Sequence, residues 1–268
     1  MIRKINAIVI LIILLTDISK AAAQAPQEST SIRQESKEIP ISLSFSFKTS
    51  HLWRGLDCSP SPYFATDLAV SDKNRIIKAG IWNGLGTNGT FKEFNHYLSV
   101  SKANFTFELW DIYNFSTDAD YNNKEYFNYR AKETGRFLDA SIKYRLRGKY
   151  PFQIMWATIL FGRDRGPLNQ YNRYSTYLEV EYPIYRSGLI NFDLGIGGAF
   201  AMRRGKNENG KKIGAHFWGD NPGITNISLK VSKDISIYNY KLPVSLYGVW
   251  NPEGNQANMQ VALTLFSM

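Results

Sequence analysis

Polar side chains, some of them charged, recur at every second position along several apolar stretches, and side chains spaced in this way could line a path for solutes. The segment 41–48, for example, reads ISLSFSFK. Successive side chains of a β-strand point to opposite faces, so such charges would share one face. The charged residues on these polar faces are Lys48, Asp67, Lys78, Glu93, Glu108, Asp139, Lys143, Arg145, Glu179, Glu181, Asp193 and Lys230. They could line a pore that selects solutes by charge. Because their signs are mixed, a paired network filling a narrow barrel is an equal alternative.

Basic residues also cluster in two segments between the apolar stretches. One cluster contains Arg163, Arg165 and Arg173, and the other contains Arg203, Arg204, Lys206, Lys211 and Lys212. Guanidinium and ammonium groups bind phosphate and carboxylate groups and attract anions over longer distances. The clusters could therefore contact lipopolysaccharide or draw anionic solutes towards the protein, although ordinary solvated loops would look the same.

Nucleophilic or metal chemistry has little support in this sequence. The histidines are His51, His96 and His216, and a Ser–His pair on a barrel wall would suit a lipid-modifying enzyme. However, no G-x-S-x-G motif selects one serine, and the histidines lack the spacing of metal ligands. We expect no enzyme activity, no catalytic residue, no metal and no cofactor. The lone Cys58 excludes an intrachain disulfide.

About twelve short strands would position these residues, because apolar and polar residues alternate with period two throughout the chain. The expected strands are 39–48, 63–70, 76–82, 92–100, 105–113, 137–145, 152–161, 176–182, 189–200, 225–231, 241–250 and 258–266. Short connections alternate with longer ones, of which the longest are 115–136 and 201–224. Outer-membrane barrels have short periplasmic turns, longer outer loops and an even strand number. The pattern predicts an all-β fold, a transmembrane antiparallel β-barrel with both ends in the periplasm.

Two further expectations concern the outer end of such a barrel. Tryptophans near the strand ends that border the longer connections would form a girdle at the membrane–water interface. These are Trp53, Trp82, Trp110, Trp218 and Trp250. The long connection 115–136 could fold inward and act as a gate.

A soluble lipocalin-like barrel or β-sandwich has the same alternation with its apolar side inward. The strand number is large for a small ligand barrel, the polar face carries many full charges, and the longer connections lie on one side only. These features favour the membrane barrel.

The N-terminus predicts export. Arg3 and Lys4 precede the apolar run Ala7–Leu15, and Ala21–Ala23 offers small residues for cleavage, as in a secretory signal peptide. We expect a signal peptide at 1–23, a flexible periplasmic tail at 24–38 and the barrel at 39–268.

Loss of Arg3, Lys4, Lys20 and Asp17 (three positive charges and one negative) would lower the net charge of +9 to about +7. An export signal argues against nucleic acid as the partner of this positive charge.

Segment 49–55 reads TSHLWRG, a Pro-containing SPSP segment precedes the second expected strand, and the third ends in Gly80-Ile81-Trp82. This opening, over Ser42–Gly84, resembles the TorF-like porin family of Gram-negative outer-membrane β-barrels. The end of the chain resembles the last hairpin of such barrels, although Ser267 and Met268 follow the aromatic Phe266. The resemblance implies a channel in the bacterial outer membrane and supplies no catalytic residues.

Taken together, these patterns predict a porin-like channel for passive diffusion of small hydrophilic solutes. A closed barrel with a structural or surface-binding role, or an outer-membrane lipid-modifying enzyme, are the alternatives. The expected partners are outer-membrane lipid, lipopolysaccharide and the solutes themselves. The sequence assigns neither the solute nor the oligomeric state.

Overall fold

The computed structural model describes residues 40–205 and 213–268. The expected signal peptide and tail therefore lie outside the described residues, as do Lys206, Lys211 and Lys212. Within the described part, the secondary structure consists of β-strands, and no helix is long and apolar enough to cross a membrane.

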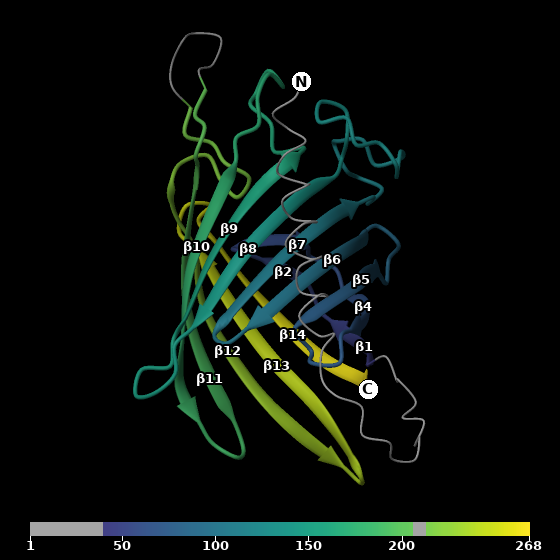
Figure 1. Ribbon diagram of the computed structural model, residues 1–268, viewed down its shortest axis with the longest axis vertical. Coiled ribbons are helices and arrows are strands. Elements are labelled where there is room, and N and C mark those ends of the chain that lie inside the picture. The colour runs from purple at the N-terminus through teal and green to yellow at the C-terminus, as the bar shows by residue number, and fades with distance from the viewer. Residues whose placement is uncertain (1–39, 206–212) are drawn as a thin grey trace, which may run out of the picture. The chain divides into compact units, whose positions relative to one another are not determined.

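Twelve strands form one closed antiparallel barrel, in which successive barrel strands pair and the last strand pairs with the first (Figure 1). These strands are β1 (Ile41–Lys48), β4 (Tyr63–Ser71), β5 (Ile77–Gly86), β6 (Lys92–Lys102), β7 (Phe105–Asn114), β8 (Phe137–Arg145), β9 (Gln153–Gly162), β10 (Ser175–Arg186), β11 (Asn191–Ala201), β12 (Gly223–Ile237), β13 (Tyr240–Asn251) and β14 (Gln256–Ser267). Each expected strand is present, so the predicted fold class is confirmed. The short turns gather at one end of the barrel and the long connections at the other.

The ring closes because β1 pairs on one side with β4 and on the other with β14. The pairing joins Ile41 to Val70 and Phe47 to Leu263, and a bulge follows Phe45. The Met268 N–H donates to the Leu43 carbonyl, which brings the last residue back to the first strand. Both ends of the barrel sequence therefore lie at the end that carries the short turns.

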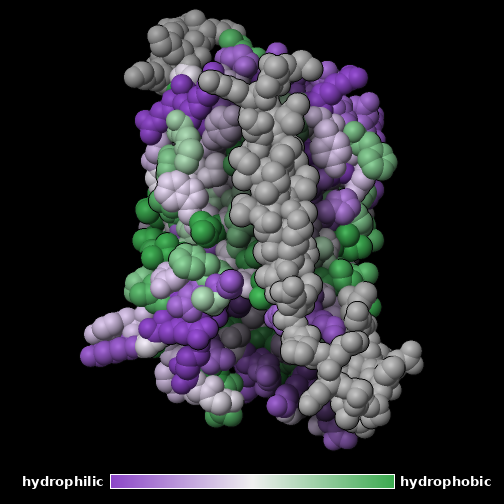
Figure 2. All heavy atoms as spheres, in the orientation of Figure 1, coloured by the Kyte–Doolittle hydropathy of each residue, from purple (hydrophilic) through white to green (hydrophobic). Residues whose placement is uncertain are grey.

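The two faces of the wall differ as the alternation predicts. Outward side chains such as Phe107, Leu178 and Ile196 are exposed, with 44%, 37% and 48% of their surface accessible. Apolar residues cover the middle of the barrel, and hydrophilic residues collect at both ends (Figure 2). Polar side chains point inward, which confirms that the polar face is the inner one.

A second, two-stranded sheet was not expected from the sequence. Its strands are β2 (His51–Trp53) and β3 (Leu56–Ser59), joined by a turn in which Arg54 and Gly55 have φ values of 51° and 91°. A Cβ atom on Gly55 would lie 1.8 Å from the Thr225 carbonyl oxygen, so only glycine fits at this contact. The connection after β1 is therefore a hairpin that folds into the barrel and reaches its far wall.

The connection 115–136 was expected to fold inward and could act as a gate. Its C-terminal half lies against the outer wall instead, and gating itself stays a prediction. Arg136 ends this connection, and its Nη1 pairs with Asp111 Oδ1 at 2.8 Å. Its guanidinium also lies 4.2 Å from the centroid of the Tyr126 ring. Asp111 pairs across the sheet with His96 and Leu138 on the outward face. The ion pair and the aromatic contacts hold the C-terminal half of the loop against the outer wall, whereas Asp120 and Tyr121 of its N-terminal half border the internal cavity.

The expected tryptophan girdle is also wrong for most of its members. Trp53, Trp82 and Trp110 border the internal cavity, and Trp218 is buried with 1% of its surface exposed. Trp250 is half exposed. The other four tryptophans contact aromatic rings inside the barrel. A position near a strand end does not show whether a tryptophan faces lipid or the interior.

Closure between β1 and β14 can be tested by crosslinking. Ser46 and Thr264 are direct partners on the inner face, where opposed Cβ atoms lie about 4.5–5.5 Å apart. In a Cys58→Ser background, the pair Ser46→Cys and Thr264→Cys should form a disulfide, visible as a mobility shift reversed by reductant on a denaturing gel. The offset pair Ser44→Cys and Thr264→Cys is the control. Equal crosslinking of both pairs, or of neither, would contradict this register.

Candidate lumen site

The barrel encloses a cavity of about 950 Å³ that runs from the long connections, at Tyr121 and Phe217, towards the short-turn end, at Lys143 and Gln153. Its walls come from the inner face of the barrel and from the β2–β3 hairpin, since Leu52, Trp53, Arg54 and Leu56 border it. A smaller cavity of about 290 Å³ lies at the short-turn end between the turn Ser187–Leu189 and strands β12–β14. The interior is thus partly filled by protein and partly open.

The structure brings most of the expected lining residues to these two cavities. Those on the larger cavity are Lys48, Glu93, Glu108, Asp139, Lys143, Glu179 and Glu181. Lys230 borders the smaller one. The remaining four, Asp67, Lys78, Arg145 and Asp193, take part in polar contacts elsewhere. Lys78 lies over the Tyr97 ring, whose hydroxyl donates to Asp67 at 2.7 Å.

Several of these charges are paired with a neighbour. Lys143 Nζ lies 2.7 Å from Glu108 Oε2. Arg186, which the sequence analysis did not select, pairs with Asp193. The Arg145 guanidinium donates to Gln153 Oε1 at 3.0 Å. The two interpretations of the polar face, a pore lining and a paired network, are therefore combined in one lumen.

Other carboxylates are held by uncharged donors. Glu93 accepts hydrogen bonds from Asn95 at 2.8 Å and from Asn114 at 3.2 Å. Glu179 accepts from the Tyr177 hydroxyl and from Asn226 Nδ2. Amide and phenol donors fix the orientation of these carboxylates without placing a positive charge beside them.

A buried ion pair in the lumen includes Arg54, which the sequence analysis did not select. Arg54, at the tip of the hairpin, donates both terminal nitrogens to the two oxygens of Asp139 on β8, at 2.8 and 2.7 Å. The Arg54 side chain is 8% exposed and that of Asp139 is 4% exposed. The guanidinium also lies 5.2 Å from the centroid of the Trp218 ring. This pair ties the hairpin across the lumen to the opposite wall.

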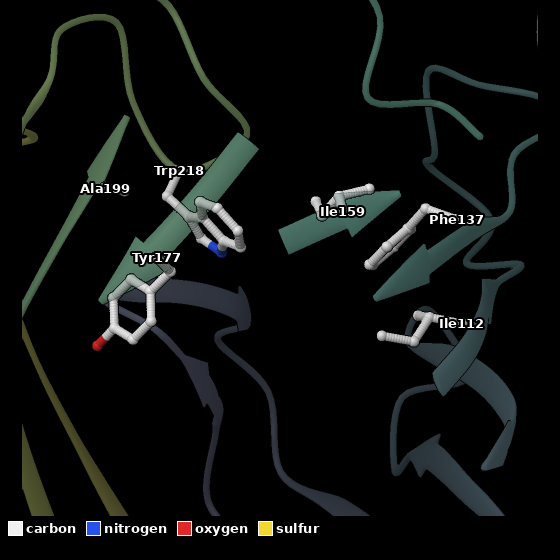
Figure 3. Close-up of a cluster of buried hydrophobic side chains, with 6 residues drawn as sticks. All are labelled: Ile112, Phe137, Ile159, Tyr177, Ala199 and Trp218. Carbon is white, nitrogen blue, oxygen red and sulfur yellow. The ribbon is translucent and has the colours of Figure 1, made fainter. Parts of the chain in front are cut away.

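A buried hydrophobic cluster surrounds the hairpin tip. Ile112, Phe137, Ile159, Tyr177, Ala199 and Trp218 form its centre, and their side chains gather from several strands and one long connection (Figure 3). Trp53 and Leu56 of the hairpin pack against it. Burial of these apolar side chains stabilises the inward position of the hairpin at about 25 cal/mol per Å² removed from water.

Hydrogen bonds fix the rest of the hairpin to the wall. Asn251 Nδ2 donates to the Gly55 carbonyl at 3.2 Å. Near the base, the Ser50 hydroxyl donates to the Met259 carbonyl at 3.2 Å. His51 Nδ1 and the Tyr63 hydroxyl are hydrogen-bonded at 2.9 Å. The hairpin is therefore attached at its tip, its turn and its base.

The basic residues of the first cluster do not lie on the outer surface. Arg163, Arg165 and Arg173 border the larger cavity. In the second cluster, Arg203 lies over the Tyr171 ring and, like Arg204, is exposed to solvent. From the sequence alone, a position in a connection between two strands does not show whether its side chain borders the cavity or is exposed to solvent.

None of the three histidine side chains is hydrogen-bonded to a serine within the described residues. His96 Nε2 faces the Tyr126 hydroxyl and His216 Nε2 faces the Asn221 carbonyl. Burial lowers the pKa of His216, which lies in a long connection. No group of three or more His, Cys, Asp or Glu side chains in residues 40–205 and 213–268 is arranged to hold a metal ion.

The fold and its interior define a closed twelve-stranded barrel with an internal hairpin. No protein-family model matches the chain, and no curated protein matches it. An outer membrane channel from Pseudomonas putida F1 is similar in structure, with a TM-score of 0.41 and 13% identity over 88% of this chain and 98% of the channel. A bacterial polysaccharide outer membrane secretin gives a TM-score of 0.39 and 10% identity over 85% and 97% of the two chains. At these values neither resemblance carries an argument about function.

Removing one partner of the Arg54–Asp139 pair should be costly, because the other charge is then buried without compensation. Arg54→Ala or Asp139→Ala should each lower the free energy of unfolding by about 3–5 kcal/mol. Chemical denaturation of the folded barrel measures this loss. The double variant Arg54→Met with Asp139→Leu should recover much of it. Losses that simply add in the double variant would show that the two side chains do not interact.

Proposed function

We propose that this chain is an outer-membrane channel of a Gram-negative bacterium, through which small hydrophilic solutes pass by diffusion along the barrel lumen. The observation that carries the proposal is the contrast between the two faces of the wall. A belt of exposed apolar side chains surrounds the barrel, and charged residues border a cavity of about 950 Å³ inside it.

The outer face supports a membrane location. A spanning segment must pair every backbone polar group within the protein, and a closed sheet does so. Exposed apolar side chains across the middle of the wall would be stabilised by lipid, whereas Lys or Arg facing lipid there would cost about 2–4 kcal/mol. The expected export signal would deliver the chain to the periplasmic side, and the resemblance to TorF-like porins agrees with this destination.

The inner face supports a solute path. Small hydrophilic solutes could follow the charged and amide groups between the hairpin and the wall, and the mixed charges would hydrate both cations and anions. The hairpin narrows this path, so a small conductance is expected. Arg203 and Arg204, which are exposed in a long connection, stay candidates for lipopolysaccharide contact.

A closed barrel with a structural or surface-binding role is the second candidate. The anchored hairpin favours it, because Arg54 crosses the lumen to Asp139 on the opposite wall. A barrel sealed in this way would conduct no ions, so the two candidates differ in a single measurement.

Single-channel conductance of the refolded chain in a planar bilayer tests the proposal. We expect small, steady current steps. Lys143→Glu should shift the ion preference towards cations and Glu179→Lys towards anions, because both residues border the cavity. Arg204→Gln, in an exposed connection, is the control and should leave the preference unchanged. A folded barrel without current steps would favour the closed barrel.

The membrane location can be tested separately by fluorescence. Trp156 on β9 is 42% exposed on the outer face, and Trp110 borders the inner cavity. Lipids with brominated acyl chains should quench part of the emission of the folded chain. Trp156→Phe should reduce the quenched fraction, because that indole would contact acyl chains. Trp110→Phe should not reduce it, and the opposite ranking would contradict the assignment of the two faces.

A further inference from the structure

Arg163 lies at the mouth of the larger cavity, directly after the last residue of β9. Its guanidinium carbon is 3.8 Å from the centroid of the Tyr121 ring, 5.0 Å from that of Phe217 and 5.1 Å from that of Phe137. Three aromatic rings from three segments of the chain thus hold this charged group in place. Such packing orients the guanidinium, because cations are attracted to aromatic faces.

The Arg163 guanidinium has no anionic partner among the described residues. Its Nε is buried and makes no hydrogen bond, and no carboxylate lies within 4.0 Å of its nitrogens. A buried donor without an acceptor costs about 1–3 kcal/mol, and more when it is charged. A group that completes this site is therefore expected to be an anion.

The nearby carboxylates are held by other groups. Asp164 accepts hydrogen bonds from the backbone N–H and the hydroxyl of Ser175, at 2.7 and 2.8 Å. Glu93 is held by two asparagine side chains, as described above.

Arg165 and Arg173 border the same cavity as Arg163 and add positive charge near its mouth. Glu93 and Asp120 also border the cavity and offset part of that charge, so three guanidinium groups face two carboxylates in this part of the lining. The local field therefore favours an anion over a cation.

The wall beside Arg163 is apolar and aromatic. Phe217 and Phe137, which touch its guanidinium, also pack against Trp53 of the hairpin, with ring centroids 5.8 and 5.9 Å from that of Trp53. Trp53 and Phe217 both border the cavity. A flat apolar body could stack on these rings while its charged end reaches Arg163.

We propose that this site binds small organic anions that join a carboxylate to an aromatic or other flat apolar body. The carboxylate would accept two hydrogen bonds from the guanidinium of Arg163, a pairing that guanidinium geometry favours. The apolar body would lie against Phe217 and Trp53. This assignment names a substrate class for the proposed channel and rests on that proposal for its role in transport, although binding itself can be measured without it.

The first test uses the unaltered chain, folded in detergent, with benzoate as the probe. Trp53 lies beside the proposed site, so its emission should change on binding. We expect a saturable change with benzoate and none with benzyl alcohol or benzylamine, which keep the ring but lack the negative charge. Equal responses to all three compounds would overturn the inference, and so would the absence of a response to benzoate.

The second test uses variants of the site. Arg163→Gln should weaken benzoate binding by about tenfold or more, because it removes a charged hydrogen-bond donor pair. Arg163→Lys should restore only part of the affinity, since an ammonium group cannot form the two parallel bonds. Arg203→Gln, in a different connection, is the matched control and should bind as the unaltered chain does. Unchanged affinity in a folded Arg163→Gln chain would overturn the inference.

Conductance distinguishes this inference from the proposed function. Current steps that benzoate interrupts, in a manner abolished by Arg163→Gln, would support both. Saturable benzoate binding to a barrel that conducts nothing would support the site and contradict the channel. Conduction that benzoate does not alter, together with no binding in detergent, would support the channel and contradict the site.

Discussion

The ring of backbone hydrogen bonds is the constraint on which the rest of this structure depends. Once β1 pairs with both β4 and β14, no strand of the barrel has a free edge. Closure also divides every strand into an inner and an outer face, because side chains alternate along it. The separation of the apolar belt from the charged interior depends on that arrangement.

The inside of the ring is organised around the β2–β3 hairpin. Its tip carries Arg54, whose charge can be buried only because Asp139 meets it with both carboxylate oxygens. Aromatic side chains then fill the space around the pair, which explains why Trp53 and Trp218 lie inside the barrel and not at a lipid interface. The same aromatic residues hold Arg163 beside the cavity. The hairpin tip, which narrows the lumen, and the proposed anion site therefore share one set of contacts.

The sequence predicts the wall of the barrel well and its contents poorly. Alternation such as that of 41–48 depends on contacts between neighbouring strands, so period two is enough to locate the strands and to assign the inner charges. The hairpin at 51–59 is too short to show a period, and it is determined by partners far along the chain, including Asp139, Thr225 and Asn251. For the same reason, the sequence could not distinguish Arg163, which borders the cavity, from Arg203, which is exposed.

The central claim is that the β2–β3 hairpin lies in the lumen and limits a path through the barrel. The most direct measurement is the single-channel conductance of a chain in which residues 51–59 are replaced by a short Gly-Ser linker, compared with the unaltered chain under the same salt conditions. The account predicts a folded barrel with a conductance several-fold larger, because the obstruction is gone. An unchanged conductance in a folded barrel would contradict it, since the hairpin would then play no part in limiting the path.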